Sequence, residues 1–189
     1  MTEVYFVRHA EPNYDNHDEL TRELSEKGMK DRLSVTDFLT KSKIDIILSS
    51  PYKRAIDTVS DYAKKTGIGI IIVDDFRERR VDSDWIEDFD AFVKKQWADF
   101  DYKLSDGECL REVQERNIHA LRSVLQTYSG KCIAIGSHGT ALCTVINYYD
   151  RSFGYNGFEE IRNLMPYIVH FSFDGTKCVR IERYDPLIS

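Results

Sequence analysis

The first side chains in this sequence that could do chemistry are Arg8 and His9, which directly follow the apolar run VYFV at residues 4–7. A guanidinium group binds phosphate oxygens through a planar, bidentate pair of N–H groups. A neutral imidazole next to it can attack phosphorus directly. An Arg-His pair at the end of a predicted strand has the residue types for binding and attacking a phosphoryl group, and the rest of the sequence decides whether further groups join it.

Two other apolar runs also end in polar residues. IDIIL at residues 44–48 leads into Ser49-Ser50-Pro51, with Arg54 one helical turn later, and CIAIG leads into Ser137-His138-Gly139. In open α/β sheets, ligand sites form beyond the carboxyl ends of the strands. Each residue alone has an ordinary structural explanation, but their joint placement at strand ends predicts a site with two arginines and two histidines.

Catalysis of phosphoryl transfer depends mainly on positioning the reacting groups and on hydrogen bonds from cationic groups to the equatorial oxygens. One imidazole would be the nucleophile, and a second, protonated one would hold an oxygen. The leaving alkoxide also needs a proton from a carboxyl group that is kept protonated near neutral pH. The sequence has no H-E-x-x-H, Walker or dinucleotide-binding glycine signature. We therefore expect no metal and no cofactor.

The elements that must hold these side chains alternate along the chain. Buried strands are predicted at residues 4–7, 44–48, 68–73 and 132–136. Helices are predicted near 24–41 with a start at Ser25, at 50–67 with Ser50 as N-cap and Gly67 as the stop, and at 107–130. Residues 167–184 predict a β-hairpin turning at Asp174-Gly175. The fold class expected is α/β, a three-layer sandwich with a mainly parallel central sheet, helices on both faces and a C-terminal hairpin.

The segment 78–106 departs from this alternation because it is acidic and rich in aromatic residues. Trp85, Phe89 and Phe92 have the i, i+4, i+7 spacing of one helix face. A helix packed on the core is the favoured interpretation, and a lid over the site is the alternative. We expect one domain over residues 1–189 with a lid-like insert near 78–106.

Composition excludes several classes of protein. The chain of 189 residues is 42% hydrophobic with a net charge of -6 and has no long Lys/Arg run, so we expect no nucleic-acid partner. No apolar stretch is long enough for a membrane span or a signal peptide, so a soluble, cytoplasmic protein is expected. The four cysteines are scattered and are expected to be buried, reduced thiols: Cys109, Cys132, Cys143 and Cys178.

Several short motifs together resemble the histidine phosphatase superfamily, the phosphoglycerate-mutase-like fold. They are Arg8-His9, LSEKG (24–28), SSPYKRAIDT (49–58), a glutamate in FRER (76–79), GECLREVQER (107–116) and GSHG (136–139). The resemblance implies that His9 is the nucleophile that forms a phosphohistidine. It also implies that Arg8, Arg54 and His138 line the phosphate pocket and that Glu78 protonates the leaving group.

The sequence departs from the family pattern at four places, one of which is Cys109 in place of the serine of the common Gly-Glu-Ser. Ala10 replaces the usual glycine after Arg-His. The asparagine that many mutases place nearby has only Asn13 and Asn16 as displaced candidates, which weakens a mutase interpretation. The Gly-x-Trp-Glu-Gly stretch after the acid is absent, so Asp82 and Asp84 remain rivals to Glu78 as proton donor.

We therefore predict a metal-independent phosphomonoester hydrolase acting through a phosphohistidine on a small phosphorylated metabolite. A phosphoglycerate mutase, a catalytically weak phosphate-binding or regulatory module, and a protein phosphohistidine or phosphotyrosine phosphatase are the alternatives. The expected partner is the small phosphorylated substrate, with neither nucleic acid nor membrane, and a homodimer is left open. Structural roles are expected for the remaining histidines, His17, His119 and His170.

Overall fold

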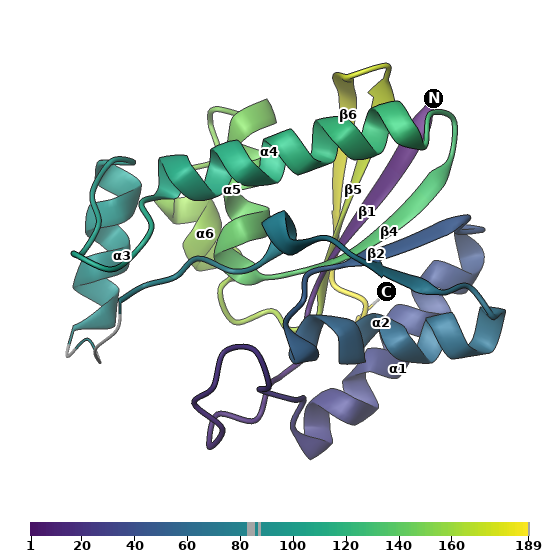
Figure 1. The fold of residues 1–189 in the computed structure, drawn as a ribbon, viewed down its shortest axis with the longest axis horizontal. Coiled ribbons are helices and arrows are strands. Elements are labelled where there is room, and N and C mark those ends of the chain that lie inside the picture. The colour runs from purple at the N-terminus through teal and green to yellow at the C-terminus, as the bar shows by residue number, and fades with distance from the viewer. Residues whose placement is uncertain (83–85, 87, 189) are drawn as a thin grey trace.

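The computed structural model describes residues 1–82, 86 and 88–188, and its centre is a six-stranded sheet. The strand order is β3-β2-β4-β1-β5-β6 (Figure 1). Strands β1 to β4 pair in parallel, whereas β5 and β6 are antiparallel. The strands are β1 (Thr2–Arg8), β2 (Ile46–Ser49), β3 (Ile70–Ile72), β4 (Cys132–Ser137), β5 (Tyr167–Asp174) and β6 (Lys177–Tyr184).

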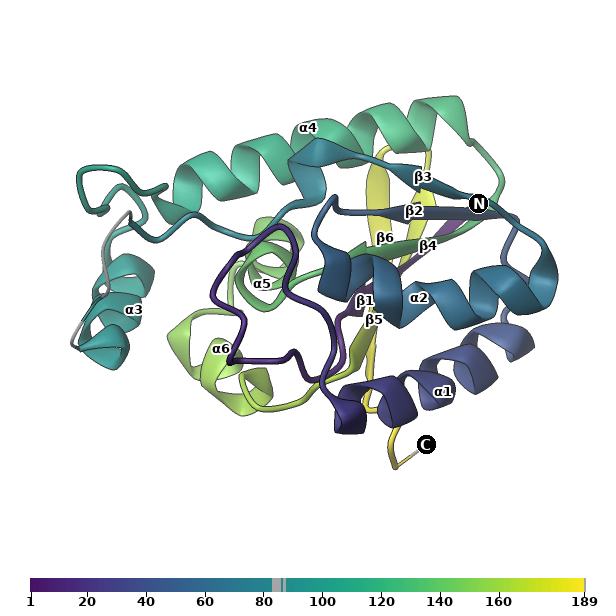
Figure 2. The same ribbon diagram turned by 60° about the horizontal axis from the view of Figure 1, so that its bottom comes forward.

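Helices cover both faces of this sheet, with α1 and α2 on one side and α4 and α5 on the other (Figure 2). The predicted three-layer α/β arrangement with a C-terminal hairpin is confirmed. The helices are α1 (Glu26–Lys41), α2 (Lys53–Thr66), α3 (Phe89–Ala98), α4 (Leu110–Thr127), α5 (Gly139–Tyr149) and α6 (Tyr155–Ile161), and a short 3-10 turn spans Asp74–Phe76.

The central strand β1 shows how the two layers share the sheet. Side chains alternate between the faces of a strand, so Val4 and Phe6 pack in the cluster that contains α4 and α5, and Val7 packs in the cluster that contains α1 and α2. All three are fully buried. Burial on both faces explains why this strand is a continuous apolar run in the sequence.

Helix α1 begins as predicted at Ser25, whose hydroxyl accepts the N–H of Gly28 at 3.0 Å. A glycine is needed inside this helix because a Cβ at position 28 would lie 2.1 Å from the carbonyl oxygen of Glu11. The close approach brings the chain that follows Arg8-His9 onto the first turn of α1.

Helix α2 begins later than predicted. Its first residue is Lys53 and its N-cap is Tyr52, so the assignment of Ser50 as N-cap is wrong. The Ser50 hydroxyl accepts the N–H of Tyr52 at 3.1 Å in a turn before the helix, and it also contacts His138. Gly67 ends the helix in the left-handed conformation, as predicted.

Strand β3 is a second correction. It was predicted as a buried strand over residues 68–73, but it covers only Ile70–Ile72, and Ile71 and Ile72 are 46% and 49% exposed. The reason is its position at the edge of the sheet, next to β2. A run of three isoleucines indicates a strand, but it does not indicate whether the strand is central.

The segment 78–106 contains the predicted amphipathic helix, α3, which lies at the far end of the molecule from the hairpin (Figure 1). Phe92, Val93 and Trp97 are buried in the cluster that includes Phe158 of α6. Phe89 is 42% exposed, so the predicted stripe is wrong there, because the buried face begins one turn later. Trp85 lies outside the described residues.

Candidate active site

The carboxyl ends of three parallel strands meet at one edge of the sheet. Arg8 pairs in register with Ser137, and Ser49 pairs with Gly136. The next backbone N–H groups continue this pattern, since His9 donates to the Ser137 carbonyl at 3.1 Å and Ser50 donates to that of Gly136 at 2.9 Å. The strand ends therefore do come together, with the ring centroids of His9 and His138 5.3 Å apart, and Glu78 joins them through its bonds to the start of α5. We call Arg8, His9, Arg54, Glu78 and His138 the strand-end pocket.

The imidazole of His9 is held in one tautomer by its own neighbour. Its Nδ1 lies 2.8 Å from the carbonyl oxygen of Ala10, and because a carbonyl can only accept, Nδ1 carries the proton. The Ala10 N–H donates to the Thr58 hydroxyl at 3.0 Å, which fixes the Ala10 peptide on helix α2. The Nε2 lone pair of His9 is thereby left for attack on an electrophile.

His138 is the N-cap residue of α5 and is fully buried. Its Nε2 lies 2.6 Å from the hydroxyl of Ser50, and its ring centroid lies 5.3 Å from that of His9. Its Nδ1 is buried and has no hydrogen-bond partner among the described residues. A buried ring nitrogen without a partner is costly, so it suits a bound ligand with polar atoms.

Burial lowers the pKa of both His9 and His138 well below the ordinary value, and the positive charge of Arg54 lowers it further. Both rings are therefore neutral in the ligand-free protein at neutral pH. We predicted a protonated second imidazole, and the lowered pKa of His138 favours its neutral form instead. The cause is burial, together with the positive charge of Arg54 near the ring.

Arg8 is anchored by backbone carbonyls rather than by a carboxylate. Its Nη1 donates to Ile161 at 2.7 Å and Leu164 at 3.1 Å, and its Nη2 donates to Arg162 at 2.8 Å. Its Nε is buried without a partner among the described residues. Gly139 packs directly on this guanidinium, because a Cβ there would lie 3.1 Å from Nη2. Arg8 keeps its full charge and unused N–H groups for a ligand.

Arg54 lies in the first turn of α2 and is only 3% exposed. Its Nη2 donates to a carboxylate oxygen of Glu19 at 2.7 Å and its Nη1 donates to the Glu19 carbonyl at 2.9 Å. Arg22 contacts the other carboxylate oxygen of Glu19 at 2.9 Å. Glu19 and Arg22 were not predicted as site residues, because they lie in an irregular loop where no periodicity signals their position.

Glu78 is bound to the N-terminus of α5, directly after His138. Its carboxylate accepts the N–H of Thr140 at 2.9 Å and that of Ala141 at 3.0 Å. A third N–H comes from Arg79 at 2.7 Å. Two of these N–H groups belong to the first turn of α5, so this helix fixes the position of the carboxyl group beside the second histidine of the pocket.

Arg116 of α4 holds the backbone that carries Glu78. Its guanidinium donates to the carbonyls of Asp75 and Arg77 at 2.7 and 2.8 Å and pairs with Glu108 at 2.8 Å. Glu108 in turn accepts the N–H of Arg80 at 2.9 Å. Arg116 and Glu108 both belong to the GECLREVQER motif, in which Glu108 lies just before α4 and Arg116 lies on it. An acidic and a basic residue at the two ends of this motif could have signalled their pairing.

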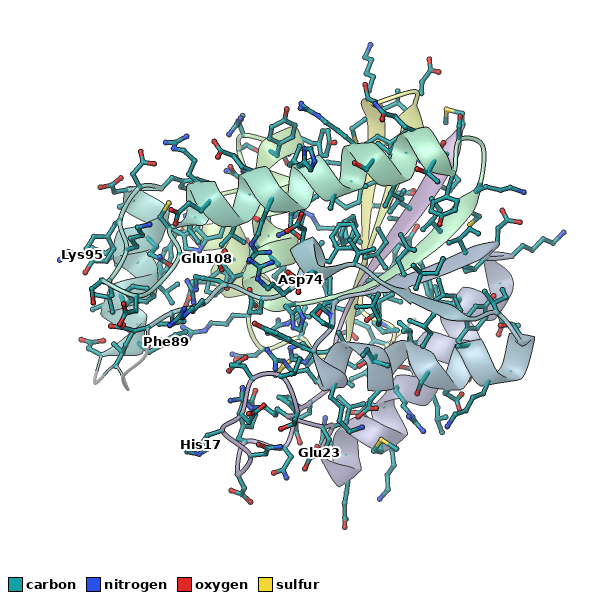
Figure 3. All side chains as sticks on the ribbon, in the orientation of Figure 1. His17, Glu23, Asp74, Phe89, Lys95 and Glu108 are labelled. Atoms are coloured by element: carbon teal, nitrogen blue, oxygen red, sulfur yellow. The ribbon has the colours of Figure 1, made fainter. Side chains whose placement is uncertain are left out.

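The remaining predicted candidates lie elsewhere or have other partners. Asn13 and Asn16 both bind Glu23 within the first loop, which Figure 3 shows carrying His17 and Glu23. Asp82 follows Glu78 in the same segment, and Asp84 lies outside the described residues. His119 is exposed on α4, and His170 is buried in β5.

The cysteines are free thiols, as expected, but only two of the four are buried. Cys109 is the N-cap of α4, where its sulfur replaces the usual hydroxyl, and Glu112 completes a capping box. Burial raises the pKa of the Cys143 thiol to about 12, so this residue is inert despite its place near Arg8. Cys132 and Cys178 are partly exposed.

A family model for the histidine phosphatase superfamily (branch 1) matches residues 4–183. The chain belongs to this superfamily. Among curated relatives, it is 29% identical over 147 residues to the uncharacterized phosphatase PhoE of Bacillus subtilis, which covers 75% of this chain and 74% of that protein. It is 27% identical over 161 residues to the probable phosphoglycerate mutase GpmB of Salmonella arizonae, covering 78% and 74%.

A solved structure supports the same fold. The phosphoserine phosphatase of Entamoeba histolytica, in complex with 3-phosphoglyceric acid, superposes with a TM-score of 0.78 over 99% of this chain and 100% of that one, at 20% identity. Superfamily membership and the mixed sheet with its terminal hairpin are thus confirmed. Among the residues that the structure describes, no helix is both long and apolar enough to cross a membrane.

Proposed function

We propose that this histidine phosphatase superfamily member is a metal-independent phosphomonoester hydrolase that acts on a small phosphorylated metabolite. The observation that carries the proposal is the geometry of His9. Its Nδ1–H is bound to the Ala10 carbonyl, so the Nε2 lone pair is available, and two nearly buried guanidinium groups flank it. A nucleophile beside two cations suits a phosphoryl group, whose charge they neutralise as it transfers.

The reaction proceeds in two displacements. In the first, Nε2 of His9 forms a bond to phosphorus while the ester P–O bond breaks, and the carboxyl group of Glu78 gives its proton to the leaving oxygen. In the second, water attacks the phosphohistidine, the N–P bond breaks, and the Glu78 carboxylate takes the proton of the water. When orthophosphate leaves, Glu78 again carries its proton and His9 again has a free Nε2 lone pair.

The other pocket residues bind the phosphoryl oxygens. Arg8 contributes N–H groups that its carbonyl partners leave unused, and Arg54 contributes its terminal nitrogens. The unpartnered Nδ1 of His138 supports a role for this ring at the third oxygen. The negative charge of a bound phosphoryl group would raise the proton affinity of this ring. His138 would then become the protonated imidazole that holds a phosphoryl oxygen.

The test is hydrolysis of p-nitrophenyl phosphate in the presence of a chelator by the wild type and by His9→Ala. We expect metal-free turnover that is lost in the variant. The phosphorylated protein trapped during turnover should be stable in alkali and labile in acid, which distinguishes an N–P bond from a phosphoester. Activity that requires a divalent cation, or that survives in His9→Ala, would refute the mechanism. A panel of phosphorylated metabolites would then define the substrate.

A phosphoglycerate mutase is the second candidate, and the similarity to GpmB is what favours it. A mutase must return the phosphoryl group to the product instead of losing it to water. Interconversion of 2- and 3-phosphoglycerate without release of orthophosphate would select this alternative. Release of orthophosphate as the main product would select the hydrolase.

A further inference from the structure

We propose that Glu19 is an internal competitor for the phosphate site, so that its carboxylate occupies Arg54 in the free protein and is displaced when a phosphoryl group binds. The inference rests on the proposed function, because it takes Arg54 to be a phosphate ligand. Glu19 then determines the affinity for substrate and for orthophosphate without taking part in bond making.

The contacts of Glu19 are those that a phosphate group would make. One carboxylate oxygen accepts from Nη2 of Arg54 at 2.7 Å, and the other lies 2.9 Å from Nη1 of Arg22. The Glu19 carbonyl oxygen accepts a hydrogen bond from Nη1 of Arg54 at 2.9 Å. Carboxylate and phosphate oxygens both fit the guanidinium fork, so a phosphoryl group that binds both terminal nitrogens of Arg54 displaces the carboxylate of Glu19 from them.

The burial of the two partners is unequal, and this permits exchange. The side chain of Arg54 is 3% exposed, whereas that of Glu19 is 53% exposed. Glu19 can move into water and regain its hydration, but the buried guanidinium would be left without a counter-ion at a considerable cost. Glu19 therefore leaves most readily when another anion replaces it.

The loop that carries Glu19 is held both at its base and at its tip, where Nε of Arg22 also donates to the Asn16 carbonyl at 2.6 Å. At the base, Pro12 bridges to Leu24, and Asn13 donates to the Glu23 carbonyl at 2.8 Å. At the tip, the N–H of Lys53 donates to the Leu20 carbonyl at 3.0 Å, and Leu20 is 55% exposed. Displacement of Glu19 therefore needs only a rotation of its exposed side chain, with the loop backbone and the His9 strand end undisturbed.

The test compares Glu19→Gln with the wild type. Glutamine keeps the size and an acceptor oxygen but removes the charge that competes with phosphate. We expect the dissociation constant for orthophosphate, measured by titration calorimetry, and the KM for p-nitrophenyl phosphate to fall by about five- to tenfold, with kcat unchanged. Glu19→Ala should also lower both the dissociation constant and the KM, so that the result does not depend on one substitution.

Two control variants make the outcome specific. Glu26→Gln makes the same change on an exposed residue in the first turn of α1 and should leave the dissociation constant at the wild-type value. Arg54→Gln should abolish orthophosphate binding. If Arg54→Gln abolishes binding but Glu19→Gln and Glu19→Ala leave it unchanged or weaken it, the competitor role is wrong and the proposed function stands. If the wild type neither binds orthophosphate nor hydrolyses phosphomonoesters, the proposed function fails and the competitor role fails with it.

Discussion

Two parts of the molecule bury histidine in opposite ways. In the strand-end pocket, His9 and His138 are buried beside arginines, and neither ring contacts a carboxylate among the described residues. On β5, His170 lies between two carboxylates, with Nε2 2.6 Å from Glu3 and Nδ1 3.1 Å from Glu182. The His170 ring also stacks on Tyr5 with centroids 4.2 Å apart.

The difference separates a structural histidine from a reactive one. Both ring nitrogens of His170 already have partners, so this residue has no capacity left for a ligand. Among the described residues, the hydrogen bonds of the pocket leave one nitrogen of each ring without a partner, and the carboxylate that pairs with Arg54 is that of the exposed Glu19. Buried polar groups that lack partners in the free protein are suited to a substrate that supplies them.

The largest effect is expected for His9→Asn, which should lose activity and still fold. Asparagine retains a polar group of similar reach but cannot form the N–P bond, so kcat should fall by at least about a thousandfold. The thermal unfolding midpoint should stay close to that of the wild type. The matched control is His119→Asn on the exposed face of α4, and a comparable loss of activity in that control would show that the effect is not specific to the pocket.

Glu78→Gln should reveal the proton donor through its dependence on the leaving group. We expect kcat/KM to fall about a hundredfold for an alkyl phosphate, whose alkoxide needs a proton, and much less for p-nitrophenyl phosphate. Asp82→Asn and Asp84→Asn should show no such dependence. If one of these two variants shows it and Glu78→Gln does not, the assignment of the acid moves to that aspartate.

Substitution of His170 should cost stability and leave catalysis intact. In His170→Ala the carboxylates of Glu3 and Glu182 lose a shared donor and the stacked ring is lost, so the free energy of unfolding should fall by about 2 kcal/mol. Urea denaturation measures this change. Turnover of p-nitrophenyl phosphate by the folded variant tests whether kcat is unaffected. A tenfold drop in kcat in the folded variant would contradict the structural role.

The burial of His9 and His138 beside arginines should also make the stability of the protein depend on pH. The pKa of His9 and of His138 is lowered by burial, so the unfolded chain binds protons below pH 6.5 that the folded protein does not bind. Stability should therefore fall as the pH drops from 6.5 toward the folded-state pKa values, by up to about 1.4 kcal/mol per pH unit for each histidine. Denaturation from pH 7 to pH 5 should show a shallower slope in His9→Asn, and an unchanged slope would argue against a neutral buried ring.

Much of the fold could be predicted because apolar periodicity reports burial. The runs at 4–7 and 132–136 are central strands, and Gly67 ends α2 where its left-handed conformation is required. The prediction failed where two environments share one pattern. Ile71 and Ile72 lie on an edge strand although they are as apolar as the central strands, and Ser50 has the composition of an N-cap but bonds to His138 before the helix begins.

The sequence by itself determined which side chains stand at the strand ends, because parallel strands of a sheet place their carboxyl ends at one edge. It could not determine how those side chains are paired. Arg8 binds carbonyls more than 150 residues away, Glu78 binds the start of α5 at a separation of 62 residues, and Arg54 binds Glu19 at a separation of 35. Such contacts depend on the paths of irregular segments, which no periodicity encodes, so only the tertiary structure decided that Arg8 is anchored by distant carbonyls and that Arg54 is paired with an exposed carboxylate.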